Sequence, residues 1–345
     1  MKALYFSDIH QVKLIDVPKP VLKTDKDVIV RITSTTICGS DVHIIEGVIP
    51  SEPGFVLGHE YAGVVEQVGA AVQNFKVGDR VIGPPAPYCG NCHNCEKGFV
   101  GHCINGGIHG CGVTRGDLSG THAEYICVPH ADSCLRKLPD NISDEQAIFI
   151  SDIGTTGYTP AVHFGIKETD SVVVFGCGPV GLAAIATTKL KNPKRIIAVE
   201  KSPARLAKAR EMGATHGILA GKDDVLAQIA HYTNNLGADL VIDAVGLEIT
   251  LQQGLACLGI GGKLFLVGIT NKPIMIDPAY FFKNINISMG LSDLKLTDYL
   301  LKKVIAGELD LTPLITHTMK LDDIEEALEL FINKPDEAIK IIIKP

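Results

Sequence analysis

The sequence predicts an α/β protein that combines a β-rich domain with a doubly wound parallel sheet. In about the first 150 residues, short alternations of apolar and polar positions predict strands joined by turns. From residue 171 to residue 289, apolar strands alternate with helical segments, as in a parallel sheet covered by helices. A chain of 345 residues is too long for one ordinary core, so we expect two domains.

Composition narrows the classes of function. The chain is 46% hydrophobic and 21% charged, and its net charge of -7 disfavours nucleic acids and anionic membranes as partners. No signal-peptide layout opens the chain, and no apolar run approaches the roughly 18 residues of a membrane span. We therefore expect a cytoplasmic protein that acts on a small molecule.

The alternation assigns strands to both parts of the chain. Those of the first part follow an opening strand and span residues 13–17, 27–33, 61–68, 78–82 and 120–128. Those of the second part span residues 171–175, 195–199, 216–219, 239–243, 263–267 and 285–289. Between two of these strands, Ser202 as cap, Pro203 in the first turn and Gly213 past the end delimit a helix.

A candidate catalytic metal site begins at Cys38 and His59, a thiol and an imidazole of the kinds that zinc prefers. A catalytic zinc takes three protein ligands and leaves a fourth position open, so a third donor is required. Asp152 is the candidate that we find. Ser40 and His43 lie between the first two donors in sequence and could pass a proton from the reacting oxygen to solvent.

Asp152 is expected at the end of a helix that Ser143 caps, with Gln146 three residues later. A lone aspartate after a helix is commonly a solvated turn residue. Flanking isoleucines, and a turn expected at 154–157, favour a buried carboxylate here instead.

A second metal site is indicated by four closely spaced cysteines. They are Cys89, Cys92, Cys95 and Cys103. Four thiolates close a tetrahedral zinc site without an open position, so this zinc would be structural. The short spacings strain disulfides, and the crowding favours metal binding in a reducing cytosol. His93 and His102 are then solvated loop residues.

A dinucleotide site is indicated by three glycines that directly follow the strand at 171–175. Gly176 permits the tight turn, Gly178 lets backbone approach the pyrophosphate, and Gly181 packs the next helix against the strand. The following strand ends in Glu200, where an acid is expected to bind the adenosine ribose. A carboxylate there favours NAD over NADP, although the neighbouring Lys201 and Arg205 leave NADP open.

These motifs together resemble the zinc-dependent medium-chain dehydrogenase/reductase family over essentially the whole chain. The matching stretches are 38–43, 58–60, 78–81, the cysteine lobe and 176–181. The resemblance implies a GroES-like catalytic domain at 1–154 and 292–345 and a Rossmann domain at 155–291, with substrate bound between them. The C-terminal part of the catalytic domain, 292–345, is expected to contain a helix capped by Asp322, with Glu325 at its third position, and a final strand at 338–343.

The resemblance also implies roles for individual residues at the catalytic site. Cys38 and His59 would be zinc ligands, and Ser40 would hand the alcohol proton toward His43. Asp41 would orient His59, and Glu60 would be a nearby carboxylate that can enter the coordination sphere.

The segment 151–157 resembles the branch of the family whose third ligand is aspartate, which includes secondary-alcohol and formaldehyde-type dehydrogenases. Members of that branch that use NADP carry Gly-Ser-Arg where this chain has Val-Glu-Lys at 199–201, and some lack the cysteine lobe. The cofactor would be lined, by the same resemblance, by Thr156, Val180, Arg205, Val267, Ile269 and Leu291.

The function expected from these residues is reversible oxidation of a secondary or short-chain alcohol by NAD, with two zinc ions per chain. Formaldehyde or other aldehyde dehydrogenases and polyol dehydrogenases are alternatives that substrate profiling separates. A non-catalytic zinc- and dinucleotide-binding redox sensor is an alternative of another class, which absence of turnover would favour. A zinc-free quinone reductase fits poorly with both clusters of metal-type residues. The family usually forms homo-oligomers, so a dimer or tetramer is expected.

Overall fold

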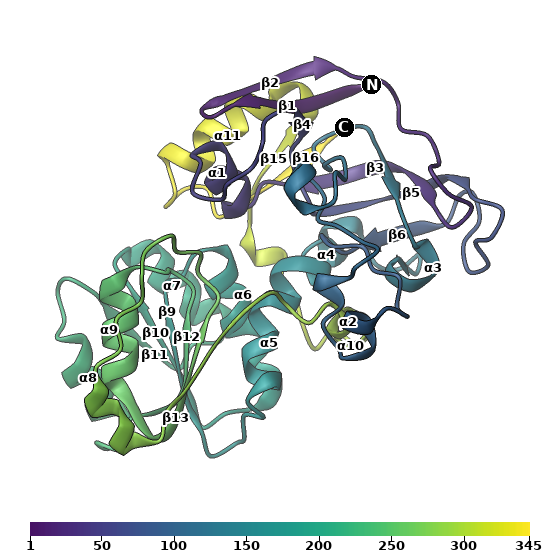
Figure 1. Ribbon diagram of the computed structural model, residues 1–345. Helices are drawn as coiled ribbons and strands as arrows, with labels where there is room; N and C mark the ends of the chain where they lie inside the picture. The colour runs from purple at the N-terminus through teal and green to yellow at the C-terminus, as the bar shows by residue number, and fades with distance from the viewer. The chain divides into compact units, whose positions relative to one another are not determined.

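The computed structural model describes residues 1–345 and divides the chain into two compact units (Figure 1). The first unit comprises residues 1–152, 293–306 and 314–345, and the second comprises residues 153–292 and 307–313. The chain passes from the first unit to the second directly after Asp152.

The first unit is built on two sheets. Strands β1 (Lys2–Asp8), β2 (Gln11–Asp16) and β4 (Phe55–Val56) form a three-stranded antiparallel sheet in the order β2-β1-β4. A seven-stranded sheet follows the order β15-β16-β3-β5-β6-β8, and β7 also pairs with β3. Its strands are β3 (Val28–Thr36), β5 (Tyr61–Val68), β6 (Arg80–Gly83), β7 (Tyr125–Val128), β8 (Arg136–Lys137), β15 (Ile315–Lys320) and β16 (Lys340–Lys344).

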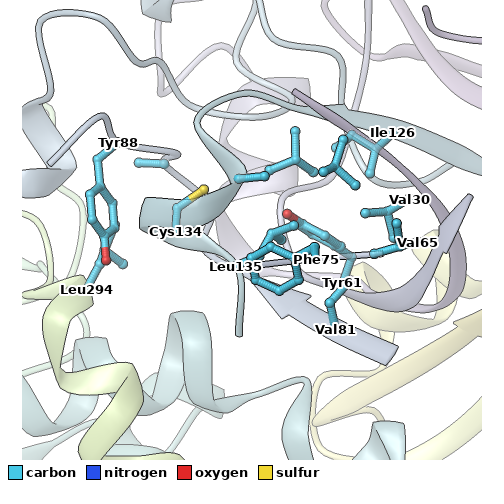
Figure 2. Close-up of a cluster of buried hydrophobic side chains, with 14 of the residues drawn as sticks. Val30, Tyr61, Val65, Phe75, Val81, Tyr88, Ile126, Cys134, Leu135 and Leu294 are labelled. Carbon is cyan, nitrogen blue, oxygen red and sulfur yellow. The ribbon is translucent and has the colours of Figure 1, made fainter. Parts of the chain in front are cut away.

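The helices of the first unit are mostly short. They are α1 (Gly39–Ile45), α2 (His93–Glu96), α3 (Ala131–Cys134), α4 (Asp144–Ala147), α10 (Thr297–Ile305) and α11 (Ile324–Asn333). Figure 2 shows part of the core that the larger sheet buries, with Val30, Tyr61, Val65, Val81 and Ile126 converging from four strands. Because successive side chains of a strand point to opposite faces of the sheet, the side chains between these residues lie on the other face.

The second unit is built on a single parallel sheet of six strands, in the order β11-β10-β9-β12-β13-β14. This order is that of a dinucleotide-binding sheet. The strands are β9 (Ser171–Phe175), β10 (Arg195–Glu200), β11 (His216–Leu219), β12 (Ala238–Asp243), β13 (Leu258–Leu266) and β14 (Asn286–Met289). All six expected strands are present, with ends displaced by a few residues at most except at β13, which starts earlier.

Helices flank the parallel sheet in the second unit (Figure 1). They are α5 (Thr155–His163), α6 (Pro179–Thr188), α7 (Pro203–Met212), α8 (Val225–Tyr232) and α9 (Glu248–Cys257). One face of the sheet packs on α8 and α9, where Val225, Ile229 and Leu251 join Val173 and Val241 in one buried cluster. Helices cover a doubly wound sheet on both faces. The strands of such a sheet are therefore buried on both sides, and their sequences are almost continuously apolar.

Two expected caps form as the sequence predicts. Ser143 and Gln146 make a reciprocal capping box at α4, in which each side chain accepts a hydrogen bond from the other residue's backbone N–H. Ser202 accepts a hydrogen bond from the backbone N–H of Arg205 at α7, and Gly213 ends that helix with φ of 120°.

Three local expectations are wrong. The helix that Ser143 caps ends at Ala147, so Asp152 does not lie at its end. The segment expected as a turn at 154–157 is helical: a single π-helical turn, Ile150–Gly154, carries Asp152 and leads into α5. Asp322 does not cap α11, whose N-cap is Asp323, because Asp322 lies inside the 3-10 turn Leu321–Asp323; its carboxylate accepts a hydrogen bond from Lys2 on β1. Glu325 accepts from the backbone N–H of Leu14. Both acidic residues thus contact the β1-β2 hairpin.

No helix combines the length and the apolar character that crossing a membrane requires.

We expect His109 to make the stability of the first unit pH-dependent. The ring is fully buried, its Nδ1 lies 2.9 Å from the Ser119 carbonyl oxygen, and its Nε2 has no hydrogen-bond partner. Burial lowers the pKa of His109 to about 4. Between about pH 6.5 and pH 4 the unfolded chain therefore binds a proton that the folded chain does not, which costs up to about 1.4 kcal/mol per pH unit.

The His109→Asn variant keeps a donor for Ser119 and removes this titration. Urea unfolding followed by circular dichroism should show that, between pH 7 and pH 5, wild type loses about 2 kcal/mol more stability than the variant. Parallel losses in the two proteins would contradict the assignment.

Candidate metal centre and dinucleotide site

Four metal-type side chains converge in the first unit. The donor atoms of Cys38, His59, Glu60 and Asp152 all lie within 4.8 Å of one another. Cys38 is the N-cap of α1, His59 and Glu60 directly precede β5, and Asp152 comes from the π-helical turn. The structure thus brings together every residue that the sequence suggested for this site.

A buried carboxylate, Asp41, organises two of these donors. It lies in the first turn of α1, accepts a hydrogen bond from the Cys38 backbone N–H at 2.9 Å, and places Oδ1 3.5 Å from His59 Nδ1. Its Oδ2 also lies 3.2 Å from Nε2 of His122, a buried residue that the sequence did not single out. Burial alone would raise the pKa of Asp41, but the charges of His122 and His59 hold it well below its usual range.

His59 is fixed from both sides of its ring. Asp41 faces Nδ1, while Asp152 Oδ2 lies 3.5 Å and Ser40 Oγ 3.2 Å from Nε2. Burial would lower the pKa of His59, but the Asp41 charge and the hydrogen bond with Asp152 raise it well above its usual value. A carboxylate at Nδ1 fixes the orientation of a histidine that offers Nε2 to a metal.

Ser40 and His43 occupy successive turns of α1. Ser40 contacts the donor set through His59, whereas His43 is half-buried and its Nδ1 has no hydrogen-bond partner. No direct hydrogen bond joins the two residues. Burial lowers the pKa of His43, so its ring is neutral and can accept a proton at neutral pH.

Glu60 has a partner that the sequence analysis missed. The fully buried ammonium of Lys340 on β16 lies 2.5 Å from Glu60 Oε1 and donates to the Ile37 carbonyl oxygen at 3.0 Å. Burial raises the pKa of Glu60 to about 7 even though Lys340 opposes the rise. A single lysine in the run of isoleucines at 339–343 is a signal that could have found this pair, because a buried lysine requires an acidic partner.

The chemistry of this donor set fits a divalent transition metal. It offers a thiol, an imidazole and two carboxylates, with Glu60 Oε2 buried and without a hydrogen-bond partner. Sulfur and nitrogen together with carboxylate oxygen suit zinc rather than magnesium or calcium. Cys38, His59 and Asp152 would supply three ligands, the number that a catalytic zinc takes.

A second cluster holds the four cysteines of the lobe. The donor atoms of Cys89, Cys92, Cys95 and Cys103 lie within 4.8 Å of one another, and all four thiols are free. Backbone hydrogen bonds lower the pKa of Cys92 to about 6. Burial raises the pKa of Cys103 to about 12. Four sulfurs without a histidine fit a closed zinc site, and the exposed His93 and His102 lie outside the cluster.

The three glycines of the second unit have the steric environments that a dinucleotide loop needs. Gly176 has φ of 84°, and a Cβ added there would lie 2.4 Å from a methyl group of Val245. A Cβ at Gly181 would lie 1.9 Å from the Gly176 carbonyl oxygen. A Cβ at Gly178 would meet only the Arg205 guanidinium, at 4.0 Å, so a phosphate can approach the backbone at the start of α6.

Glu200 ends β10 as a buried, pre-oriented carboxylate. Its Oε2 accepts a hydrogen bond from the backbone N–H of Cys177 at 2.7 Å, and its Oε1 accepts from those of Lys201 and Ser202. These bonds join the glycine loop to the end of the neighbouring strand. Oε2, which accepts only one of these bonds, retains acceptor capacity for a ribose hydroxyl.

The remaining expected cofactor residues lie at strand ends or helix starts of the second unit. Val180 lies in the first turn of α6 and Thr156 in that of α5, while Val267, Ile269 and Leu291 follow β13 and β14. Ile269 and Leu291 are 42% and 48% exposed, which leaves their side chains accessible to a ligand.

Asp243 is a further organising residue that the sequence analysis did not identify. Its buried carboxylate accepts hydrogen bonds from the backbone N–H groups of Val245 and Gly246, at 2.8 and 3.0 Å. Its carbonyl oxygen accepts from the N–H groups of Val267 and Gly268. The loops after β12 and β13 are therefore tied together at the edge of the sheet where a dinucleotide binds.

We expect Cys95→Ser to remove one zinc per chain and to lower the unfolding temperature, because Cys95 is both a metal donor and a buried member of the core beneath the larger sheet. Metal analysis and a thermal melt check this. The matched control is Cys127→Ser, which changes a cysteine outside both donor sets. A Cys95→Ser protein that retains two zinc ions would contradict the assignment.

Two family models match the chain. Residues 24–140 match the alcohol dehydrogenase GroES-like domain, and residues 179–295 match the zinc-binding dehydrogenase domain. The first model covers the segment that holds most of the metal donors, and the second begins at α6.

Similar proteins span essentially the whole chain. An alcohol dehydrogenase of Cupriavidus necator is 35% identical over 371 residues, covering 100% of this chain and 99% of that protein. An L-threonine 3-dehydrogenase of Alteromonas mediterranea is 33% identical, with 91% of each chain covered. The solved structure of the alcohol dehydrogenase TADH from Thermus sp. ATN1 has a TM-score of 0.94 and 36% identity, covering 100% of this chain and 99% of that one.

Proposed function

We propose, from the premise that this chain belongs to the zinc-binding alcohol dehydrogenase family and is an NAD-dependent oxidoreductase, that it oxidises secondary or short-chain alcohols. Its cofactors are NAD and zinc. The observation that supports the proposal most directly is the convergence of Cys38, His59 and Asp152 with Ser40 Oγ against the same histidine. Three donors beside a hydroxyl are the arrangement that activation of an alcohol requires.

The chain's own residues would bind the metal and move the proton. A zinc ion supplies Lewis acidity toward the substrate oxygen, and NAD accepts hydride from the carbon. Asp41 holds His59 and the Cys38 backbone in place. Ser40 lies where it can accept the hydroxyl proton, and the neutral His43 one turn away offers the next acceptor.

One of the similar proteins favours a secondary alcohol, and the other indicates an alcohol without specifying its class. The Cupriavidus relative is an alcohol dehydrogenase, and the Alteromonas relative is named for the 3-position of threonine, which carries a secondary hydroxyl. A polyol or aldehyde substrate is the alternative within enzymes. A profile of NAD reduction with 2-propanol, 2-butanol, ethanol, formaldehyde and sorbitol decides between them, and no turnover with any of these would favour a non-catalytic role.

Asp152 is the residue on which the proposal can be tested most sharply. We expect Asp152→Ala to lower zinc from two to about one per chain. We also expect kcat/KM with 2-butanol to fall by more than about 100-fold, because the metal supplies several kcal/mol of transition-state stabilisation. Metal analysis and NAD reduction measure the two effects. Asp144→Ala, which removes a nearby acid outside the donor set, is the control for zinc content. A variant that keeps both zinc and turnover would show Asp152 to be structural.

Glu200 is proposed to set the preference for NAD. We expect Glu200→Gln to lower the ratio of kcat/KM for NAD to that for NADP by about tenfold or more. Hydrogen bonds to a charged group are worth about 1.5–3 kcal/mol, and the carboxylate also repels a 2′-phosphate. Glu211→Gln, an exposed acid on α7 that pairs with Lys208, should leave the ratio unchanged. An unchanged ratio in the Glu200 variant would show that Glu200 only holds the glycine loop in place and does not select the cofactor.

A further inference from the structure

Lys340 is a buried cation placed directly behind the donor set. It opens β16, is completely shielded from solvent and is followed by three isoleucines. Its ammonium binds Glu60 Oε1 and the Ile37 carbonyl oxygen, at 2.5 and 3.0 Å. The ring of Phe149 lies 5.5 Å away. No other carboxylate pairs with this ammonium.

Stability alone gives no reason for such a pair. Removing two charges from water costs several kcal/mol each, and apolar replacements of buried ion pairs are often neutral or stabilising. The two groups that Lys340 binds have a feature in common. Ile37 directly precedes Cys38 and Glu60 directly follows His59, so one ammonium touches the neighbours of two metal donors.

Glu60 is divided between the ion pair and the donor set. Oε1 is engaged by Lys340, whereas Oε2 is buried without a hydrogen-bond partner. A Glu60 oxygen nevertheless lies within 4.8 Å of the donor atoms of Cys38, His59 and Asp152. Glu60 is thus within a short displacement of becoming a fourth protein ligand, and the bond to Lys340 opposes that displacement.

We propose that Lys340 is a positioning residue that anchors Glu60 beside the metal donors and thereby keeps the fourth coordination position open for substrate. The proposal rests on the ligand roles given above for Cys38, His59 and Asp152. Without Lys340, Glu60 would be a buried acid whose remaining partner is the metal. The metal would be retained, but with a closed set of four protein ligands.

The test replaces zinc with cobalt and titrates the protein with imidazole, a neutral ligand that binds an open position. The cysteine lobe is already closed and gives no response, so the change in the visible cobalt spectrum reports the other site. Wild type should respond. In Lys340→Met the affinity for imidazole should fall by about tenfold or more with cobalt retained. Lys340→Arg should restore the affinity, because the guanidinium can donate to both Glu60 Oε1 and the Ile37 carbonyl oxygen.

Two further variants separate positioning from stability. Adding Glu60→Gln to Lys340→Met should recover the imidazole response, because a neutral amide is a poor replacement for water on the metal. Lys344→Met removes another lysine of β16, which pairs with Glu145 away from the donors. This matched control should lower the unfolding temperature and leave the imidazole titration unchanged.

Other results would overturn the proposal. If Lys340→Met loses stability or cobalt but binds imidazole as wild type does, Lys340 is only structural. Should that variant not fold, Glu60→Gln alone decides: retained cobalt and an unchanged titration support an anchored Glu60, whereas loss of one cobalt from the folded protein makes Glu60 a resident ligand and overturns the proposal. A wild-type protein without any imidazole response would instead refute the open metal site of the proposed function, and the role of Lys340 with it.

Discussion

The first unit depends on the burial of one carboxylate, Asp41. A charge without access to water is tolerated only where other groups replace its hydration, and here the Cys38 backbone N–H and two histidines do so. The same contacts fix the start of α1, the ring of His59 and the strand connection that bears His122. The same hydrogen bonds therefore stabilise the buried carboxylate and orient the metal donors. The groups that Asp41 contacts include Cys38 and His59, which a metal site requires in fixed positions.

The second unit solves a similar problem with backbone donors. Glu200 ends β10 and Asp243 ends β12, the two strands on either side of β9. Each carboxylate accepts hydrogen bonds from N–H groups of the loop that follows or faces it. Loops at this edge have to be open enough to admit a ligand, so they cannot be held by apolar packing alone. Buried carboxylates supply the rigidity instead, and they leave lone pairs for hydroxyl groups of a ligand.

Much of the fold and of the metal donors could be predicted from the sequence, because periodicity and motif spacing are local properties. The strand Tyr61–Val68 forms as the alternation predicts, and the Cys38, His59 and Asp152 donors converge. The π-helical turn and the start of α5 could not be foreseen, since Gly154, Thr155 and Thr156 have weak helix propensity and tertiary contacts decide their conformation. The run of isoleucines around Lys340 signals a buried lysine, but its partners lie 303 and 280 positions earlier in the chain, so no local pattern identifies them.

That sequence separation has a consequence for the order of assembly. Ile37 and Glu60 are made early in synthesis, yet the cation that satisfies them belongs to the strand containing Lys340, 303 and 280 positions later. Until that strand is synthesised and pairs with β3, the nascent chain exposes a carboxylate and a thiol that have no settled geometry. A metal ion that arrived early would meet flexible donors and could bind them in the wrong set. The described geometry of the donor set is therefore complete only once the last strand of the chain has joined the sheet.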